Sequence, residues 1–110
     1  MRQAVLRVGG LPPAPLDAAA AFHRHWLCRA RTLLAQQQDV ALLFAPAPHP
    51  HQAWRLAAVQ ELAREAAPLR VNAVAGEAGP ESEELLAWLA EARAITGQVL
   101  LAAGNPAGEA

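Results

Sequence analysis

The residues whose types suit metal binding or nucleophilic chemistry are four histidines and one cysteine. His49 and His51 stand two residues apart in the stretch FAPAPHPHQAW, residues 44–54, which also carries three prolines. His23 and His25 have the same spacing inside a segment with a helical pattern. Each pair offers two nitrogen ligands, whereas a tetrahedral zinc site needs three or four protein ligands.

The spacing argues against a metal site at either pair. Residues two apart on a helix point about 200° apart, so His23 and His25 cannot chelate one ion. His49 and His51 would need further ligands from elsewhere, and we expect solvated loop histidines and no bound metal. Cys28 lies in the helical segment among apolar residues, where a buried, unreactive thiol is the common case.

The glycine pair Gly9–Gly10 is a second candidate, because glycine-rich turns that open a helix bind phosphates through backbone N–H groups. Here the pair runs into Leu11, Pro12 and Pro13, and proline has no N–H to donate. No helix is expected for several residues after the pair. We therefore interpret it as a turn that ends a strand, and we expect no cofactor.

Composition limits the classes of partner. At 110 residues with a formal net charge of −1, the chain suits one domain, residues 1–110, and lacks the clustered basic charge of a nucleic-acid-binding protein. No apolar run approaches the roughly 18 residues of a membrane span, and the N-terminal apolar run is too short for a signal peptide. With a single cysteine, we expect no disulfide and a soluble, cytoplasmic protein.

Strand-like and helical segments alternate along the chain and must position these residues. Four short runs have the apolar pattern of strands: residues 3–8, 40–44, 70–75 and 98–103. Three helical patterns lie between them: residues 17–37, residues 52–67, and a segment that begins near Ser82. Asp17 and Ser82 are the expected N-caps. This order predicts right-handed β-α-β units around a parallel sheet, followed by a flexible tail at 103–110.

Two segments of the C-terminal half resemble a known family. LAREAAPLRVNAVAG ends a helix with Leu62-Ala63-Arg64-Glu65 and begins a strand with Arg70-Val71-Asn72. WLAEARAITGQVLLAAGN then contains the run Ile-Thr-Gly-Gln-Val-Leu before the last strand. Both resemble the C-terminal half of the short-chain dehydrogenase/reductase (SDR) family, in the family's order. We expect Asn72 to tie backbone segments together.

The resemblance implies a fold. Family sheets are ordered 3-2-1-4-5-6-7, and this chain is similar to the family from its fourth strand onward. We therefore expect an α/β fold with a partial Rossmann-like parallel sheet of about four strands and three helices. It would lack the N-terminal dinucleotide-binding half. The retained strands are neighbours in the family, so they can form one continuous sheet.

The resemblance also locates the family's catalytic positions. Family members use a tyrosine as proton donor and a lysine one helical turn later that lowers its pKa. Counting back from Leu62 places those positions at Pro48 and Gln52, and the chain contains no tyrosine and no lysine. The stretch FAPAPHPHQAW therefore corresponds to an active site whose catalytic residues are replaced, and we expect no enzymatic activity.

Two further positions of the family site are also changed. Its supporting serine falls near Ala45 or Pro46, and the asparagine of its long helix falls near Cys28 or Arg29. Together these changes imply a truncated, degenerate member of the family, a pseudoenzyme.

The family builds oligomers with the elements retained here, which correspond to 22–37, 52–67 and 81–103. The first hypothesis is therefore a non-catalytic subunit that oligomerises with an active, full-length short-chain dehydrogenase or ketoreductase and scaffolds or regulates it. The alternatives are a stand-alone NAD(P)-dependent oxidoreductase, a ligand-binding homo-oligomer, and a structural homo-oligomer or the product of a decaying gene. The expected interface residues are Phe22, Trp26, Arg29, Leu33, Trp54, Leu56, Val59, Leu62 and Trp88.

Overall fold

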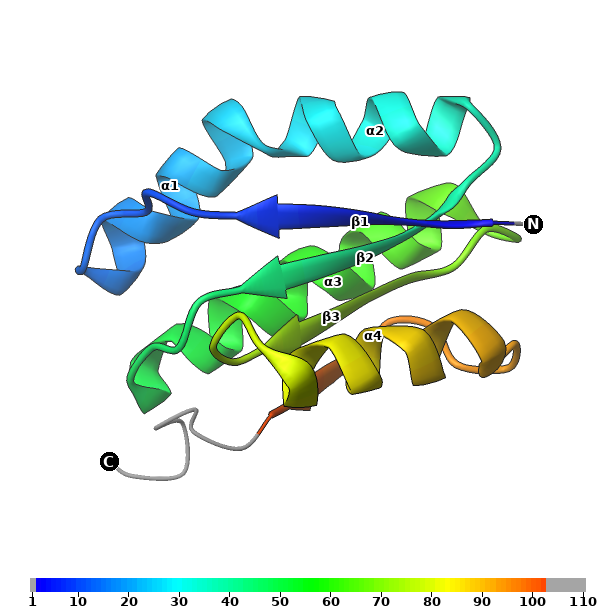
Figure 1. Ribbon diagram of the computed structural model, residues 1–110. Helices are drawn as coiled ribbons and strands as arrows, with labels where there is room; N and C mark the ends of the chain where they lie inside the picture. The colour runs from blue at the N-terminus through cyan, green and yellow to red at the C-terminus, as the bar shows by residue number, and fades with distance from the viewer. Residues whose placement is uncertain (1, 103–110) are drawn as a thin grey trace.

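A four-stranded parallel sheet carries helices on both faces in the computed structural model, which describes residues 2–102 (Figure 1). Its strands are β1 (Gln3–Val8), β2 (Asp39–Phe44), β3 (Val71–Ala75) and β4 (Val99–Leu101). They lie in the order β1-β2-β3-β4, and every neighbouring pair is parallel. The continuous sheet expected from the family's strand order is confirmed. The tail expected at 103–110 lies outside the described residues.

The three expected helical segments are present, with the first broken in two. The helices are α1 (Pro15–His25), α2 (Leu27–Ala35), α3 (Gln52–Ala66) and α4 (Pro80–Glu91), and a short 3₁₀ turn, η1 (His49–His51), precedes α3. The break falls at Trp26, where φ is −108° and ψ −27°. Trp26 N–H still donates to Phe22 O, and Ala30 N–H donates to Trp26 O. The single helix expected at 17–37 is thus two consecutive helices.

Neither expected N-cap is correct, because a proline begins each helix. Pro15 opens α1, so Asp17 lies inside the first turn and Ala14 takes the cap position. Pro80 opens α4, and Ser82 is a buried residue of the helix whose hydroxyl donates to Glu77 O at 2.6 Å. Proline suits the first helical position because its missing N–H has no helical partner there.

Alternate residues of the strands build two separate cores. In β2, the side chains of Val40, Leu42 and Phe44 join the core beneath α1, α2 and α3, whereas Ala41 and Leu43 join the core beneath α4. All six residues of β2 and all five of β3 are buried. Strands that are covered on both faces lose the polar alternation of surface strands, which explains the continuous apolar runs of the sequence.

The third crossover has the opposite hand to the first two. All three connections advance in the same direction across the sheet, so the face that a helix covers sets the hand of its crossover. The α1–α2 pair and α3 cover one face and α4 covers the other (Figure 1). The first two units are right-handed, as expected, but β3-α4-β4 is left-handed, a hand found in about 2% of such connections.

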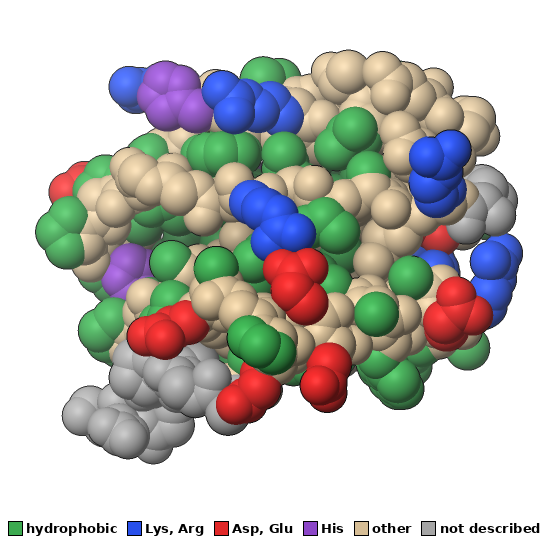
Figure 2. Space-filling view, in the orientation of Figure 1, with side chains coloured by type: hydrophobic (Ala, Val, Ile, Leu, Met, Phe, Trp, Pro, Cys, Tyr) green, Lys and Arg blue, Asp and Glu red, His purple; other side chains and the backbone are tan. Residues whose placement is uncertain are grey.

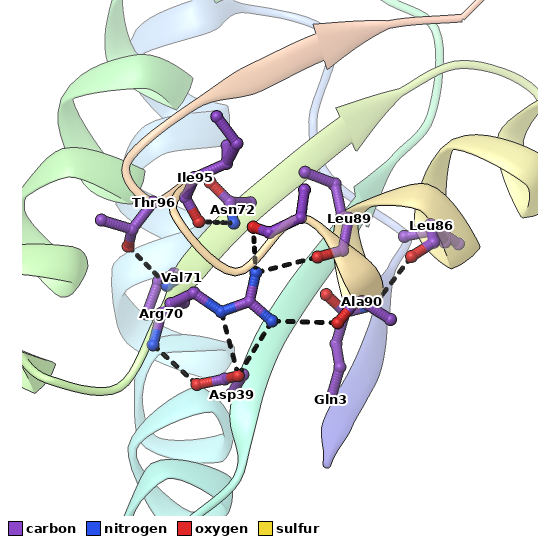
Figure 3. A network of polar contacts seen from close by, with 11 residues as sticks. Gln3, Asp39, Arg70, Val71, Asn72, Leu86, Leu89, Ala90, Ile95 and Thr96 are labelled. Carbon is purple, nitrogen blue, oxygen red and sulfur yellow. Dashed lines mark hydrogen bonds and ion pairs between the residues drawn. The ribbon is translucent and has the colours of Figure 1, made fainter. Parts of the chain in front are cut away.

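A buried ion pair anchors α4 to the sheet (Figure 3). Arg70, just before β3, donates from its backbone N–H and its Nε to the carboxylate of Asp39, at 2.8 and 3.1 Å. Its Nη atoms donate to the carbonyls of Leu89, Ala90 and Ala92 at the end of α4. The cation thereby binds three carbonyls at the C-terminal end of the helix, and its charge suits the negative end of the helix dipole.

Asn72 fixes the loop between α4 and β4 (Figure 3). Its Nδ2 donates to Ile95 O at 3.0 Å, and its Oδ1 accepts from Gln98 N–H at 3.1 Å. Thr96 adds a hydroxyl that accepts from Val71 N–H. The expected role of Asn72 in tying backbone segments together is confirmed.

No helix within residues 2–102 is both long enough and apolar enough to cross a lipid bilayer.

Candidate functional site

Two cavities open where the strands end at their carboxyl edge, the usual ligand-binding edge of open α/β sheets. The β3–β4 cavity, of about 240 Å³, is lined by side chains that include Leu56, Ala75, Val99 and Leu101. The β1–β2 cavity, of about 340 Å³, is lined by the glycine turn and the two proline loops. The two cavities share four lining residues: Ala47, Pro48, His51 and Arg55.

Pro48 and Gln52, to which the sequence resemblance assigns the positions of the family's catalytic dyad, lie at these cavities. Pro48 lines both of them and Gln52 lines the β3–β4 cavity. Pro48 comes just before η1, and Gln52 is the first residue of α3. Neither side chain can transfer a proton as a tyrosine does, and neither carries a positive charge.

His51 is buried, which corrects the expectation of a solvated loop histidine. Only 5% of its surface is exposed, because η1 turns the ring toward the first proline loop. Its Nε2 lies 3.0 Å from Pro13 O, and its Nδ1 accepts from Trp54 Nε1 at 3.1 Å. These partners fix the tautomer with the proton on Nε2. The side chain therefore joins the loop after β1 to the start of α3.

Arg55 is the least expected side chain of the site. It is 6% exposed, and its buried Nε has no hydrogen-bond partner within residues 2–102. The guanidinium carbon lies 4.6 Å from the centre of the Phe44 ring and 5.8 Å from that of Trp54. Aromatic faces attract a cation, but they do not replace a hydrogen bond to Nε.

Burial lowers the pKa of Arg55 to about 10, well below the ordinary value of a guanidinium. The group therefore carries its positive charge at neutral pH. Buried cations are ordinarily paired with an anion, and a group whose pKa is shifted by burial inside a cleft marks a candidate site.

Sequence reasoning missed Arg55, although the helical period contains a signal for it. Arg55, Val59 and Leu62 are spaced by four and three residues, which places them on one face of α3. That face is the buried one. A charged residue in register with two core residues is thus the sequence feature that points to this site.

The glycine turn after β1 forms as expected. Strand β1 ends at Val8, Gly10 has a φ of 70°, and α1 begins only at Pro15. The two glycines line the β1–β2 cavity together with Pro12 and Pro13.

The other candidate ligands of the sequence lie apart. His23, His25 and His49 are exposed, and within residues 2–102 no three His, Cys, Asp or Glu residues are grouped to hold a metal. Cys28 is also exposed, which corrects its expected burial. It stands two residues before the buried Ala30 of α2, and this spacing turns its side chain to the outer face of the helix.

Three of the expected interface residues are interior residues instead. Phe22 and Val59 are 0% exposed and Leu62 is 3% exposed, since all three pack against the sheet. Phe22 contacts the rings of Phe44 and Trp54 at centroid distances of 5.7 and 5.6 Å. A side chain enclosed by its own chain cannot contact a partner, so these three residues are wrong as interface residues.

The remaining expected interface residues keep different amounts of surface. Trp26, Leu33 and Trp54 are partly buried against the core. Arg29 is exposed, with its guanidinium carbon 4.6 Å from the centre of the Trp26 ring. Leu56 and Trp88 are 39% and 53% exposed.

Trp88 belongs to an apolar surface on α4 and β4. It lines a shallow groove with Leu85 and Ala87 of α4, and with Leu101 and Ala102 at the end of β4. Leu101 is 49% exposed. Two glutamates, Glu81 and Glu84, border the groove. We call this set of residues the α4–β4 surface.

Comparison with known proteins gives one family match. The model of the SDR-like family, described as short chain dehydrogenase-like protein, matches residues 6–102. Comparisons with curated proteins and with solved structures gave no match. The match begins within β1 and spans every later strand and helix described above, and the chain therefore belongs to the SDR-like family of short chain dehydrogenase-like proteins.

Proposed function

We propose that this chain is a non-catalytic SDR-like subunit that associates with an active, full-length short-chain dehydrogenase or ketoreductase and scaffolds or regulates it. The lack of any tyrosine or lysine supports the first half of this proposal, because the family's proton transfer depends on both. The sequence resemblance assigns the positions of that tyrosine and lysine to Pro48 and Gln52, which line the β3–β4 cavity.

The α4–β4 surface is the observation that carries the second half. Trp88 and Leu101, 53% and 49% exposed, lie in one groove on the last helix and strand. The family forms one of its oligomer contacts with the corresponding elements. Exposed aromatic residues that adjoin other apolar side chains are typical centres of protein interfaces.

The charge around this surface indicates the chemistry of the partner. Helix α4 carries Glu81, Glu83, Glu84 and Glu91, and acidic side chains gather over it in Figure 2. A partner that fits this surface has an apolar centre with a basic rim, since opposite charges speed association and fix its orientation.

Light scattering of the tagged protein, purified from its native host, tests the proposal. We expect a complex with a larger dehydrogenase, identified by mass spectrometry, and Trp88→Glu should weaken it by at least about 30-fold. Leu16→Glu is the matched control, because Leu16 is 84% exposed on α1, away from the α4–β4 surface. A homo-oligomer, or a complex that Trp88→Glu leaves intact, would contradict the proposal.

Calorimetry with NADH and NADPH tests the stand-alone oxidoreductase. We expect no heat of binding to the isolated chain, and saturable binding of either nucleotide would restore that alternative.

A further inference from the structure

The feature that the proposed function leaves unused is the unpaired, buried cation at the carboxyl edge of the sheet. Arg55 lies where the two cavities meet and lines both. Its Nε donates no hydrogen bond within residues 2–102, although almost all of the residue is removed from solvent. A buried cation without a counter-charge costs free energy, and an anion in either cavity would compensate the charge of the guanidinium.

We propose that Arg55 binds the carboxylate of a small, largely apolar molecule held in the β3–β4 cavity. A guanidinium matches a carboxylate in shape, with parallel N–H donors that face two oxygens. The rest of the lining is mostly apolar and includes Leu56, Val99 and Leu101. Such a lining suits the body of the molecule, while Arg55 orients its charged end.

The lining also argues against a phosphate ligand. Arg55 is the single Lys or Arg side chain among the residues that line the two cavities. Several other lining residues are prolines, among them Pro12, Pro46 and Pro48, which have no backbone N–H to offer. A phosphate is commonly bound by several backbone N–H groups, often with a second cation. One guanidinium balances the single charge of a carboxylate.

The size of the cavity limits the molecule. A cavity of about 150 Å³ accommodates benzene, and the β3–β4 cavity measures about 240 Å³. An aromatic or short aliphatic monocarboxylate, such as benzoate or hexanoate, fits this volume. A nicotinamide dinucleotide does not.

Aromatic residues and His51 position the guanidinium. Phe44 and Trp54 lie beside it, with ring centroids 5.6 Å apart, and the Trp54 indole is held by its hydrogen bond to His51. His51 uses both ring nitrogens in this arrangement. It is therefore a positioning residue, and Arg55 is the residue that contacts the ligand.

The test is a titration of the full chain with benzoate and hexanoate, followed by ¹⁵N NMR and by the melting temperature. Benzyl alcohol and hexanol serve as neutral analogues, and inorganic phosphate as the competing anion. We expect saturable shifts of the Trp54 indole resonance, assigned with Trp54→Phe, for at least one carboxylate. The alcohols and phosphate should bind at least about 10-fold more weakly.

Arg55→Met keeps the length and the apolar contacts of the side chain and removes its charge. It should weaken carboxylate binding roughly 10- to 100-fold, the loss of one charge-assisted hydrogen-bonding group. Arg64→Met is the matched control, since Arg64 is an exposed arginine of the same helix, and it should leave binding unchanged. Should Arg55→Met fail to fold, Arg55→Lys retains a charge at the site and provides the comparison.

Three results would overturn the proposal: equal binding of an alcohol, binding by Arg55→Met within about twofold of the parent chain, or no saturable shift up to about 10 mM carboxylate. The site does not depend on the proposed partner, so binding by the isolated chain is informative even where no complex with a dehydrogenase exists.

Discussion

At the residue scale, the carboxyl edge of the sheet combines two cavities with one buried cation, Arg55. Pro48 and Gln52, the positions that the sequence resemblance assigns to the family's proton donor and its cation, line these cavities, and Arg55 lies one turn further along α3. On our proposal, this edge binds a ligand and does not carry out the family's reaction.

The first prediction concerns the pH dependence that Arg55 imposes on stability. Burial lowers the pKa of Arg55 to about 10 in the folded chain, below its ordinary value in the unfolded chain, so the unfolded state binds more protons in the pH window that begins near 10. The free energy of unfolding should therefore rise with pH in that window. Below about pH 10 the guanidinium is charged in both states, so the full destabilisation caused by burying its charge is present. We expect the free energy of unfolding to increase by about 1–2 kcal/mol, a value that already allows for solvent screening of the charge.

The measurement is urea denaturation of the parent chain and of Arg55→Met at pH 9 and pH 11.5. Since the chain has no tyrosine and no lysine, these common alkaline titrations do not complicate the comparison. A difference between the two proteins that does not change with pH would refute the assignment of a buried, unpaired cation.

At the residue scale, the sequence predicted Asn72 correctly and His51 and Cys28 incorrectly. Asn72 lies inside a buried strand, where an amide must find backbone partners. The burial of His51 depends on the path of two proline loops, one of which comes 38 residues earlier. No local pattern encodes a contact of that range.

At the element scale, α4 depends on one buried arginine. Arg70 satisfies three carbonyls at the end of α4 and is itself neutralised by Asp39. The ion pair therefore links the beginnings of β2 and β3 to the C-terminal end of α4, the helix that covers the opposite face of the sheet.

The second prediction is that Asp39→Asn lowers the free energy of unfolding by about 3–5 kcal/mol, because it leaves the Arg70 cation buried without a counter-charge. Glu65→Gln is the matched control, since its partner Arg31 and Glu65 itself are both exposed, and exposed ion pairs contribute little. Chemical denaturation of both variants measures the difference. Equal effects of the two substitutions would show that burial of the pair does not matter.

Most helices and strands were predictable, because the spacing of apolar residues that identifies them is a local feature of the sequence. The strands were found to within a few residues, since buried strands require continuous apolar runs. The hand of the third crossover was not predictable. The apolar stripe of α4 shows that one side of the helix is buried, but not which face of the sheet the helix covers. The general preference for right-handed crossovers predicted a right-handed β3-α4-β4 unit, and this prediction was wrong.

At the scale of the whole molecule, the sheet has an open edge at β1. Among residues 2–102 this strand pairs with β2 alone, and Val5 is 37% exposed on the face that α4 covers. Arg7 and Gln3 reach from β1 to Glu83 and to Leu86 O of α4. These polar contacts cover the edge only in part. An open strand edge is a template for pairing with another chain.

The third prediction is that the isolated chain, without its proposed partner, self-associates at high concentration through the β1 edge. Val5→Lys should reduce this self-association while changing the free energy of unfolding by less than about 0.5 kcal/mol. A lysine on an edge strand opposes pairing of strands between molecules. Light scattering over a concentration series, with Leu16→Lys as the control on α1, measures the effect. Unchanged self-association in Val5→Lys would exclude the β1 edge as its cause.

The left-handed third crossover has a consequence for synthesis on the ribosome. Residues up to Gly76 emerge first, and they contain the first three strands together with the three helices of one face. Until α4 follows, Ala41, Leu43 and Val74 remain uncovered on the other face, and Arg70 lacks its helical acceptors. Exposed apolar surface on a nascent chain attracts chaperones. We therefore expect emergence of α4, rather than completion of the first two crossovers, to be the event that releases this chain from chaperones.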